Sequence, residues 1–308
     1  ISIYLGEQLT DVLEHIAHGD VVDQTPSGIL ETGVATLPKL PRDGSDRNRT
    51  SPFAFTGNKF EFRMVGSSAS VAISSYVLNT IVADALCKIA DRLESCTDFD
   101  AEIQKIVQET VRDHGRIIFN GNNYTDEWVE EAARRGLPNL HNTVDAITAM
   151  IAPKNIAVME RHHVMSSAEC HSRYEIMLEN YCKILNIEAA TMCEMSRRQI
   201  LPAAIRFTGG LAESFSSLKA AGIENRSVRD LAQLLSDDIS EADRLTGELE
   251  RALERCAESA DLLENARYHR DCIRRLMEKL REVADRMEKF VAASEWPIPT
   301  YADLLYRV

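Results

Sequence analysis

The sequence predicts an α+β fold that is predominantly α-helical. Apolar residues recur with a period of about 3.6 through most of the chain, as they do in amphipathic helices. The one convincing β signal is a hairpin pattern, with alternating aromatic residues on either side of Gly57-Asn58. The 308 residues include only 14 Gly and 9 Pro, a composition that also favours helix.

Charge and cysteine usage narrow the class of protein. The formal net charge is −13, so we expect no binding of nucleic acid or of an anionic membrane. No apolar run reaches the ~18–20 residues of a membrane span, and residues 1–5 do not resemble a signal peptide. The 7 cysteines form no CxxC pair, which favours reduced thiols and a cytoplasmic location. Because the chain does not start with Met, we expect it to be a fragment of a longer protein.

The first elements are predicted in chain order. Helical spacing covers residues 1–16. Residues 19–46 are broken by Pro and Gly and predict a long ordered loop of the kind that often carries function. The hairpin spans residues 47–65. A helix then continues to about residue 93, with Ser67 or Ser68 as its predicted N-cap.

Three shorter elements come next. Thr97 and Asp98 are suited to cap the next helix. Residues 117–119 predict a short strand. Thr125 precedes a helix with an acidic first turn, which we expect to stop at Gly136.

The residues after 165 predict long helices. One runs from about 167 to 195, and Pro202 and Gly209-Gly210 are expected to interrupt or kink the helical segment after it. Ser227 is the predicted cap of the next helix. The last helix carries a heptad seam formed by Ile273, Leu276, Leu280, Val283, Met287 and Phe290. We predict an antiparallel helix bundle or hairpin here, and two domains at residues 1–165 and 166–308.

The second strand of the hairpin carries the candidate chemistry. Side chains alternate between the faces of a strand, so Lys59, Glu61 and Arg63 share one face at a spacing of about 7 Å. A carboxylate between two cations stays ionised and is suited to ligate a hard cation such as Mg²⁺. The flanking cations are suited to meet phosphate oxygens. This layout fits part of a phosphoryl-transfer site.

The same pattern has a plainer interpretation, a half-exposed strand with a solvated polar face. Arg47 and Arg49 add positive charge just upstream, but a two-residue turn does not by itself place Arg49 beside Glu61. The chain has no P-loop and no GxGxxG or GxSxG motif.

Several segments resemble the glutamine synthetase family, and in particular its large type III branch. The most specific segment runs from Arg47 to Arg63, where an Arg-Asn-Arg turn is followed by a basic-x-Glu-x-Arg strand. The segment at 64–68 continues the likeness, and further similarity lies at 118–128, 172–176 and 186–189. The resemblance therefore covers most of the chain.

The resemblance implies an ATP-dependent ligase that joins ammonia to glutamate through a γ-glutamyl phosphate. It implies that Glu61 ligates the divalent metal, Mg²⁺ or Mn²⁺, that bridges the phosphates. By the same resemblance Arg63 meets the transferred phosphoryl group, and Arg49 stabilises the charge of that group or of glutamate. Lys59 lies near the nucleotide.

The resemblance also carries expectations about the whole molecule. It implies a homo-oligomer, a dodecamer of two rings with sites between subunits. It implies that the end of a β/α catalytic domain precedes a type-specific helical region.

Two departures from the family pattern matter. The family carries a further Arg shortly after the Arg-Asn-Arg turn, where Ala54 and Phe55 stand here. The family's other metal ligands are expected to precede the first residue of this chain. A site built from Glu61 alone has too few ligands, so we expect the isolated chain to be inactive.

Two other classes of function stay open at this point. In one, the helices from Ser167 onward form a non-catalytic assembly or interaction module. In the other, a zinc-stabilised helical adaptor uses His162, His163, Cys170 or His171, although zinc sites usually show tighter paired spacing.

Overall fold

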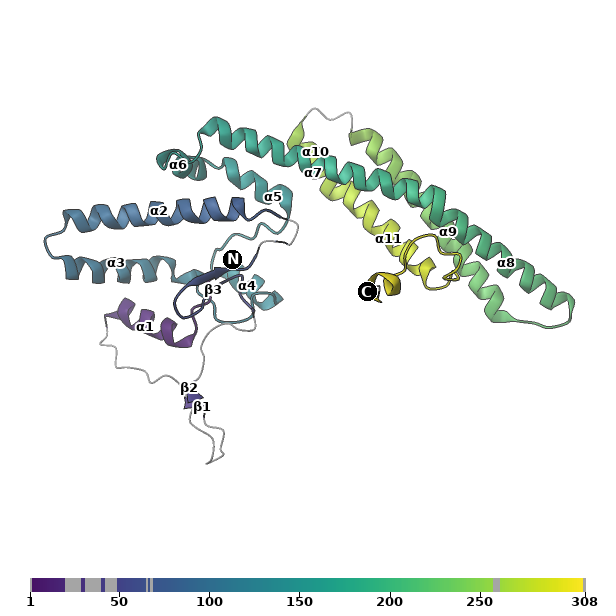
Figure 1. The fold of residues 1–308 in the computed structure, drawn as a ribbon, viewed down its shortest axis with the longest axis horizontal. Helices are drawn as coiled ribbons and strands as arrows, with labels where there is room; N and C mark the ends of the chain where they lie inside the picture. The colour runs from purple at the N-terminus through teal and green to yellow at the C-terminus, as the bar shows by residue number, and fades with distance from the viewer. Residues whose placement is uncertain are drawn as a thin grey trace. The chain divides into compact units, whose positions relative to one another are not determined.

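In the computed structural model the chain forms two compact units, each of which is described by itself (Figure 1). The structure describes residues 2–19, 29–30, 40–41, 49–64, 66, 69–256 and 261–306. Unit 1 comprises Ile1–His141 and Pro153–Ser166, and unit 2 comprises Asn142–Ala152 and Ser167–Val308. Most described residues are helical, which confirms the prediction of a predominantly α fold. The assignment of residues 1–165 and 166–308 to different functional domains stays a prediction.

Strands are short in the described part of the chain. β1 (Ile29–Leu30) pairs antiparallel with β2 (Leu40–Pro41), and β3 (Phe53–Phe55) pairs antiparallel with β4 (Phe60–Phe62). β1 and β2 lie inside the predicted loop, whose residues 20–28, 31–39 and 42–46 are outside the described residues. Arg47, which the sequence places just upstream of the candidate site, is also outside them. The described residues contain no larger sheet, so the predicted end of a β/α domain is not seen in them.

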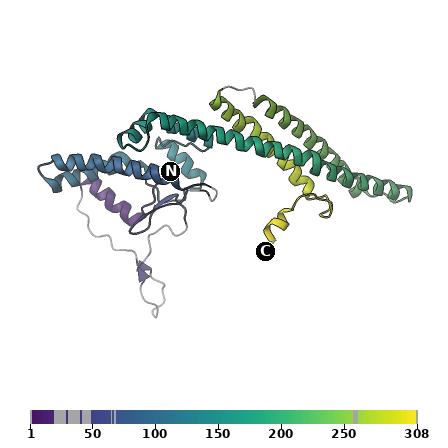
Figure 2. The ribbon, with the colours of Figure 1, turned by 45° about the horizontal axis from the view of Figure 1, so that its top comes forward.

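Unit 1 contains the β3–β4 hairpin together with helices of different lengths. α2 and α3 lie side by side as an antiparallel pair, and α1 packs against α3 (Figures 1 and 2). As predicted, the Asp98 side chain caps α3 by accepting a hydrogen bond from the Ala101 N–H at 3.1 Å. The helical elements of the unit are α1 (Glu7–His18), α2 (Ala72–Ser95), α3 (Phe99–His114), the 3₁₀ turn η1 (Gly115–Ile117), α4 (Asp126–Arg134) and α6 (Pro153–Arg161).

A backbone ladder joins the start of the chain to two distant segments. The Ile3 N–H donates to the Ile117 carbonyl at 2.9 Å, and the Phe119 N–H donates to the Ile3 carbonyl at 3.0 Å. The Tyr4 N–H donates to the Phe53 carbonyl at 2.9 Å, and the Phe55 N–H returns to the Tyr4 carbonyl at 2.8 Å. The prediction of helix from residue 1 is therefore wrong before α1, because these amides pair with distant backbone segments instead.

Two further boundaries in unit 1 differ from prediction. At 117–119 a 3₁₀ turn and a single β-bridge at Ile118 replace the predicted short strand. α2 begins only at Ala72, whose N–H donates to the Ser70 hydroxyl at 3.2 Å, while the predicted caps Ser67 and Ser68 lie outside the described residues. α4 starts after Thr125 as predicted.

A buried carboxylate ties α2 to α6. Asp84 lies midway along α2 and is almost fully buried. Its oxygens contact Lys88 at 2.6 Å, Arg161 at 2.5 Å and His162 at 3.0 Å. Lys88 first, then His162 and Arg161, hold the pKa of Asp84 far below its usual range. This cluster stabilises the ionised carboxylate and fixes the packing of the two helices.

α2 also presents apolar side chains to its surroundings. Among the described residues, α2 alone is long and apolar enough to cross a membrane by length and composition, and 11% of its most apolar window is buried. The exposed apolar residues include Ile73, Ile81, Val82 and Leu86. The ion-pair cluster at the middle of α2 would be costly in a bilayer. We therefore interpret these residues as a surface for protein packing, and the absence of a membrane span stays a prediction.

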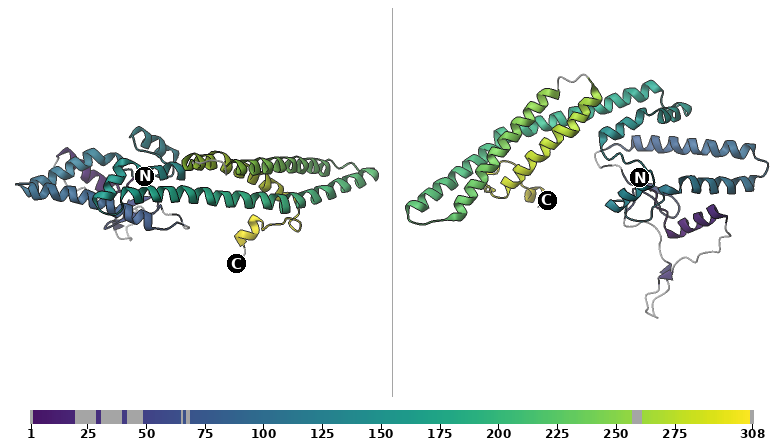
Figure 3. Two further views of the ribbon diagram at one scale, coloured as in Figure 1. Left: turned by 90° about the horizontal axis from the view of Figure 1, so that it is seen from above. Right: turned by 180° about the vertical axis from the view of Figure 1, so that it is seen from behind.

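Unit 2 is the predicted antiparallel bundle of long helices. α7 runs through the π-helical turn η3 into α8, and α9 returns alongside α8 (Figures 1 and 3). α10 continues through a second π-helical turn, η4, into α11, which packs on α9. Among the described residues, three continuous helical runs make up the bundle. Their segments are α7 (Ser167–Met195), η3 (Ser196–Ile200) and α8 (Leu201–Ala220); then α9 (Arg226–Cys256); then α10 (Leu262–Tyr268), η4 (His269–Ile273) and α11 (Arg274–Glu288). Three short helical elements of the described chain lie outside these runs: α5 (Thr143–Thr148), the 3₁₀ turn η2 (Ala149–Ile151) and α12 (Tyr301–Tyr306).

Three details of the bundle correct the prediction. α8 continues through Gly209-Gly210, and the irregularity falls at η3 instead, just before Pro202. Pro202 lacks the amide hydrogen that a regular α-helix would use at this position, and the π-helical turn η3 directly precedes it. The cap of α9 is Asn225, which accepts from the Val228 N–H at 3.2 Å, rather than Ser227. Phe290 leaves the predicted seam and is 44% exposed.

The core of the bundle follows the apolar seams of α9 and α11. Leu245 and Leu249 of α9 are buried against Ile273 and Met287. One polar contact lies inside this core, where the hydroxyls of Ser196 and Thr246 hydrogen-bond at 2.7 Å and join η3 to α9. Burial of these side chains supplies most of the driving force for the bundle.

We expect Leu249→Ala to lower the free energy of unfolding by about 2–5 kcal/mol, because it leaves a cavity in a fully buried site. Leu234→Ala on the same helix is the matched control. Leu234 is 43% exposed, so its truncation should cost no more than about 0.5 kcal/mol. Urea unfolding followed by circular dichroism measures both, and equal losses would contradict the packing described here.

We expect Asp84→Asn to destabilise the chain at neutral pH, because Lys88 and Arg161 then face a neutral amide. A lowered pKa means that the carboxylate contributes stability above the ordinary aspartate value of 3.8 and loses it as the pH falls below that value. The melting temperature of the parent chain should therefore fall more steeply than that of Asp84→Asn below about pH 4. Parallel pH profiles of the two proteins would contradict the ion-pair cluster.

Candidate functional site

The β3–β4 hairpin forms as the sequence predicts, and its turn requires a glycine. The Thr56 N–H donates to the Lys59 carbonyl at 2.8 Å, and Gly57 adopts a φ of 92°, a region that L-residues rarely enter. Phe53 pairs with Phe62 and Ala54 pairs with Glu61. The register therefore fixes which strand face carries Glu61.

The backbone ladder brings a third segment to this hairpin. Besides the bonds of Ile3 and Tyr4, the Asn123 N–H donates to the Thr50 carbonyl at 2.9 Å. This bond places residues 123–124 next to residues 49–50. The side chain of Asn123 also contacts the buried Ser2 hydroxyl.

One cavity gathers most of the predicted site residues. Arg49, Glu61, Phe62, Arg63 and Tyr124 line a hollow of about 590 Å³. Arg49 reaches this hollow although the turn alone does not place it beside Glu61. The predicted residue Lys59 contacts Glu61 but is not among the lining residues.

Glu61 lies between two cations, as strand alternation predicts. The Arg63 Nε and Nη2 atoms donate to Glu61 Oε2 at 3.1 and 2.9 Å, and Lys59 Nζ lies 3.3 Å from Oε1. Arg63 first, and then Lys59, hold the pKa of Glu61 below its usual range. The Lys59 side chain is 66% exposed and that of Arg63 only 15%. Lys59 is therefore the weaker partner, and Oε1 is the oxygen more easily released to another cation.

Arg49 has an unusual backbone for an arginine. Its φ is 55°, in the left-handed region, and its side chain forms no ion pair with the described residues. Non-glycine residues in this region carry backbone strain, which is common at functional sites. Arg49 therefore presents an uncompensated positive charge at the wall of the cavity.

The residues present fit one part of a metal–phosphate site. Glu61 offers one carboxylate, and Arg49 and Arg63 offer positive charge for phosphate oxygens. Mg²⁺ prefers six oxygen ligands. Within the described part of the chain, no cluster of three or more His, Cys, Asp or Glu side chains is placed to hold a metal.

The zinc alternative finds no support in the described residues. His162 contacts Asp84, and His171 Nδ1 contacts the Ser167 carbonyl at 2.8 Å. All seven cysteines lie in the described part of the chain, and none of them forms a disulfide. Cys170 is buried, as expected of a core thiol.

Sequence reasoning assigned no role to Tyr124. Its ring is 67% exposed, and it belongs to a turn in which its N–H donates to Asn122 Oδ1 at 3.0 Å. Only the long-range bond between Asn123 and Thr50 places it at the cavity. Local periodicity does not reveal a hydrogen bond of this kind, because the two residues are far apart in the chain.

Comparison with known proteins shows similarity along the chain. Residues 102–219 match the family model for the glutamine synthetase C-terminal domain. A type-3 glutamine synthetase of Dictyostelium discoideum is 34% identical over 315 residues, which cover 99% of this chain and 43% of that protein.

Two bacterial proteins extend this finding. A glutamine synthetase of Butyrivibrio fibrisolvens is 34% identical over 313 residues, covering 99% of this chain and 44% of that protein. A glutamine synthetase of Bacteroides fragilis (strain YCH46) is 29% identical over 319 residues, with the same coverage. The chain thus spans less than half the length of these relatives, and the resemblance predicted from the sequence is confirmed.

The backbone of Arg49 gives a test of the site's geometry. We expect Arg49→Gly to be more stable than Arg49→Ala by about 1 kcal/mol, because glycine enters the left-handed region without the Cβ penalty. At Arg112, within the regular helix α3, the order should reverse by about the same amount. Urea unfolding of the four variants measures both differences. The same order at both positions would contradict the left-handed backbone at Arg49.

Proposed function

Because this chain is a relative of the glutamine synthetases and carries their C-terminal domain at residues 102–219, we propose that it forms the C-terminal part of such an enzyme. The intact protein then joins ammonia to glutamate in an ATP-dependent reaction, through a γ-glutamyl phosphate. The observation that carries this proposal is the cavity shared by Arg49, Glu61 and Arg63. These three residues lie in the segment whose resemblance to the family is most specific.

In this function each predicted residue has a distinct role. Glu61 is one ligand of the divalent metal, Mg²⁺ or Mn²⁺, which when bound neutralises charge on the phosphates. Arg63 contacts the transferred phosphoryl group, and its guanidinium is already held in place by two bonds to Glu61. Arg49 stabilises negative charge on the phosphoryl group or on glutamate. Lys59 lies toward the nucleotide.

The physical basis of catalysis by these residues is electrostatic. The two arginines add two positive charges to a cavity that holds one carboxylate. Fixed cations of this kind stabilise the negative charge that spreads over the phosphoryl oxygens in the transition state. Because Arg63 is largely buried, its position costs little reorganisation when substrate binds.

The chain by itself is inactive in this proposal. Glu61 is a single carboxylate, and the described residues bring no other acidic or histidine ligand to it. The relatives have more than half of their length outside the matched region, which is where further ligands would reside. The exposed apolar residues of α2 offer a surface suited to packing against another protein segment.

Assembly belongs to the same proposal. The intact enzyme is a homo-oligomer, a dodecamer of two rings, with sites completed between subunits. The long bundle of unit 2 contains none of the four candidate site residues and is free to serve assembly. The competing function is a non-catalytic helical assembly module built on that bundle. Magnesium-dependent binding of ATP by the intact protein supports the enzyme and argues against the module.

We expect Glu61→Gln in the intact protein to abolish metal-dependent glutamine formation, because the amide loses the charge that holds the metal. Assembly, followed by size-exclusion chromatography with light scattering, should be unchanged. Glu94→Gln on α2 is the control, since Glu94 lies outside the cavity, and it should keep parental activity. Parental activity in Glu61→Gln would overturn the site assignment.

A further inference from the structure

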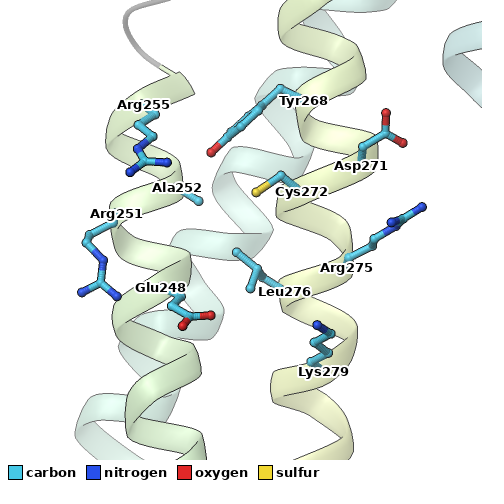
Figure 4. Close-up of a pocket in the computed structure, with 10 residues that line it drawn as sticks. All are labelled: Glu248, Arg251, Ala252, Arg255, Tyr268, Asp271, Cys272, Arg275, Leu276 and Lys279. Atoms are coloured by element: carbon cyan, nitrogen blue, oxygen red, sulfur yellow. The ribbon is translucent and has the colours of Figure 1, made fainter.

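A second hollow lies in unit 2, between α9 and the paired segment η4–α11. Its volume is about 440 Å³, within the range of small-molecule sites. Figure 4 shows Arg255 and Tyr268 extending toward each other from the two helices, with Cys272 and Leu276 facing the space between them. None of the residues assigned to the catalytic cavity contributes to it.

The hollow is lined by four cationic side chains. Arg251 and Arg255 come from α9, and Arg275 and Lys279 come from α11. None of the four forms an ion pair or a side-chain hydrogen bond with the residues that the structure describes. Arg251 extends away from α11 and Arg275 extends away from α9, so both belong to the rim of the hollow (Figure 4). In a chain with a net charge of −13, this gathering of cations is a marked local exception.

The two acidic residues of the hollow are bound mainly by other cations, although Arg275 also helps to lower the pKa of Asp271 after the larger effect of Arg270. Glu248 is already bound by Arg244 at 2.5 Å. Asp271 is bound through both of its oxygens by Arg270, at 2.8 Å each. Both partners stand outside the lining of the hollow, so the positive charge inside it is left for another anion.

The spacing of the cations destabilises the two helices when no anion is bound. Arg251 and Arg255 are an i,i+4 pair of like charge, and so are Arg275 and Lys279. Such pairs destabilise a helix, whereas opposite charges at that spacing stabilise it. The same bundle uses opposite pairs elsewhere, as in Arg274 with Glu278. At the hollow, two helices that face each other each carry a like-charge pair at a spacing where opposite charges are favoured.

The remaining wall adds a hydroxyl and an apolar surface. Burial, together with the neighbouring Cys272 thiol, raises the pKa of Tyr268 to about 12, so its hydroxyl keeps the proton and is able to donate it in a hydrogen bond. Ala252 is buried and Leu276 is half-buried beside it. Cys272 belongs to the π-helical turn η4, a local distortion that is frequent at functional sites.

We propose that this hollow, the basic groove formed by Arg251, Arg255, Tyr268, Arg275 and Lys279, binds a small phosphate-bearing anion. Arginine and lysine supply the charge-assisted hydrogen bonds that phosphate oxygens accept. The tyrosine ring and Leu276 offer the apolar surface that a nucleoside uses and that an inorganic phosphate does not. The phosphate group is the shared chemistry, and its source is decided by experiment.

The test is calorimetric titration of the full chain, in 50 mM salt without divalent metal, with inorganic pyrophosphate and with AMP. We expect saturable binding of at least one probe, and a loss of at least tenfold in affinity in the double variant Arg251→Gln/Arg255→Gln. Circular dichroism checks that the bundle stays folded. Tighter binding of AMP than of pyrophosphate identifies a nucleotide, and equal binding identifies the phosphate group alone.

Two controls separate the basic groove from other cations. Arg226→Gln/Arg229→Gln removes the same charge from the same helix outside the hollow and should change affinity less than twofold. Arg49→Gln/Arg63→Gln removes the cations of the catalytic cavity and should leave this binding in place. Absence of saturable binding of both probes, or equal losses in a control and in the groove variant, would overturn the proposal.

Discussion

The candidate site depends on one backbone ladder. Ile3 and Tyr4 hydrogen-bond to residues 117–119 on one side and to Phe53 and Phe55 on the other. Together with the bond from Asn123 to Thr50, this ladder holds three distant segments in register. Buried peptide groups must be paired, so the ladder leaves little freedom to the segments that it joins. The cavity around Glu61 exists because these segments meet.

Charge is arranged differently in the two units. In unit 1 two cations compensate each of the carboxylates of Asp84 and Glu61, and His162 is a further hydrogen-bond partner of Asp84. In unit 2 many surface arginines pair with acids along or across helices, as Arg197 does with Asp243 and Glu250. Within the described part of the chain, Arg49 and the cations of the basic groove form no such ion pair. Uncompensated positive charge is thus found at both places where a phosphate group is the proposed ligand.

Short-range sequence patterns predicted most of the helices and the β3–β4 hairpin. The hairpin turn, the cap of α3 by Asp98 and the length of α7 all follow from short-range signals. Strand alternation also placed Lys59 and Arg63 around Glu61, which the ion pairs confirm. These features are set by residues only a few positions apart, and a single sequence contains that information.

Features set by distant pairing were not predictable in this way. Helical spacing at the start of the chain did not produce a helix at Ile3, because its backbone groups hydrogen-bond to Ile117 and Phe119, which are far away in the sequence. Tyr124 joined the cavity through a bond between residues 123 and 50. Gly209-Gly210 stayed helical because tertiary packing of α8 on α9 overrides local propensity. The roles of Arg49, Lys59, Glu61 and Arg63 rest on the family resemblance and on the geometry of the cavity.

The most direct test of the central claim is an anomalous diffraction map of intact-protein crystals soaked in Mn²⁺ with a nucleotide. The account predicts a manganese peak at about 2.1 Å from a Glu61 oxygen, a distance expected for a hard divalent cation. It also predicts that Lys59, the more exposed partner, no longer contacts that oxygen. Manganese bound elsewhere, with Glu61 still held by both Arg63 and Lys59, would contradict the account.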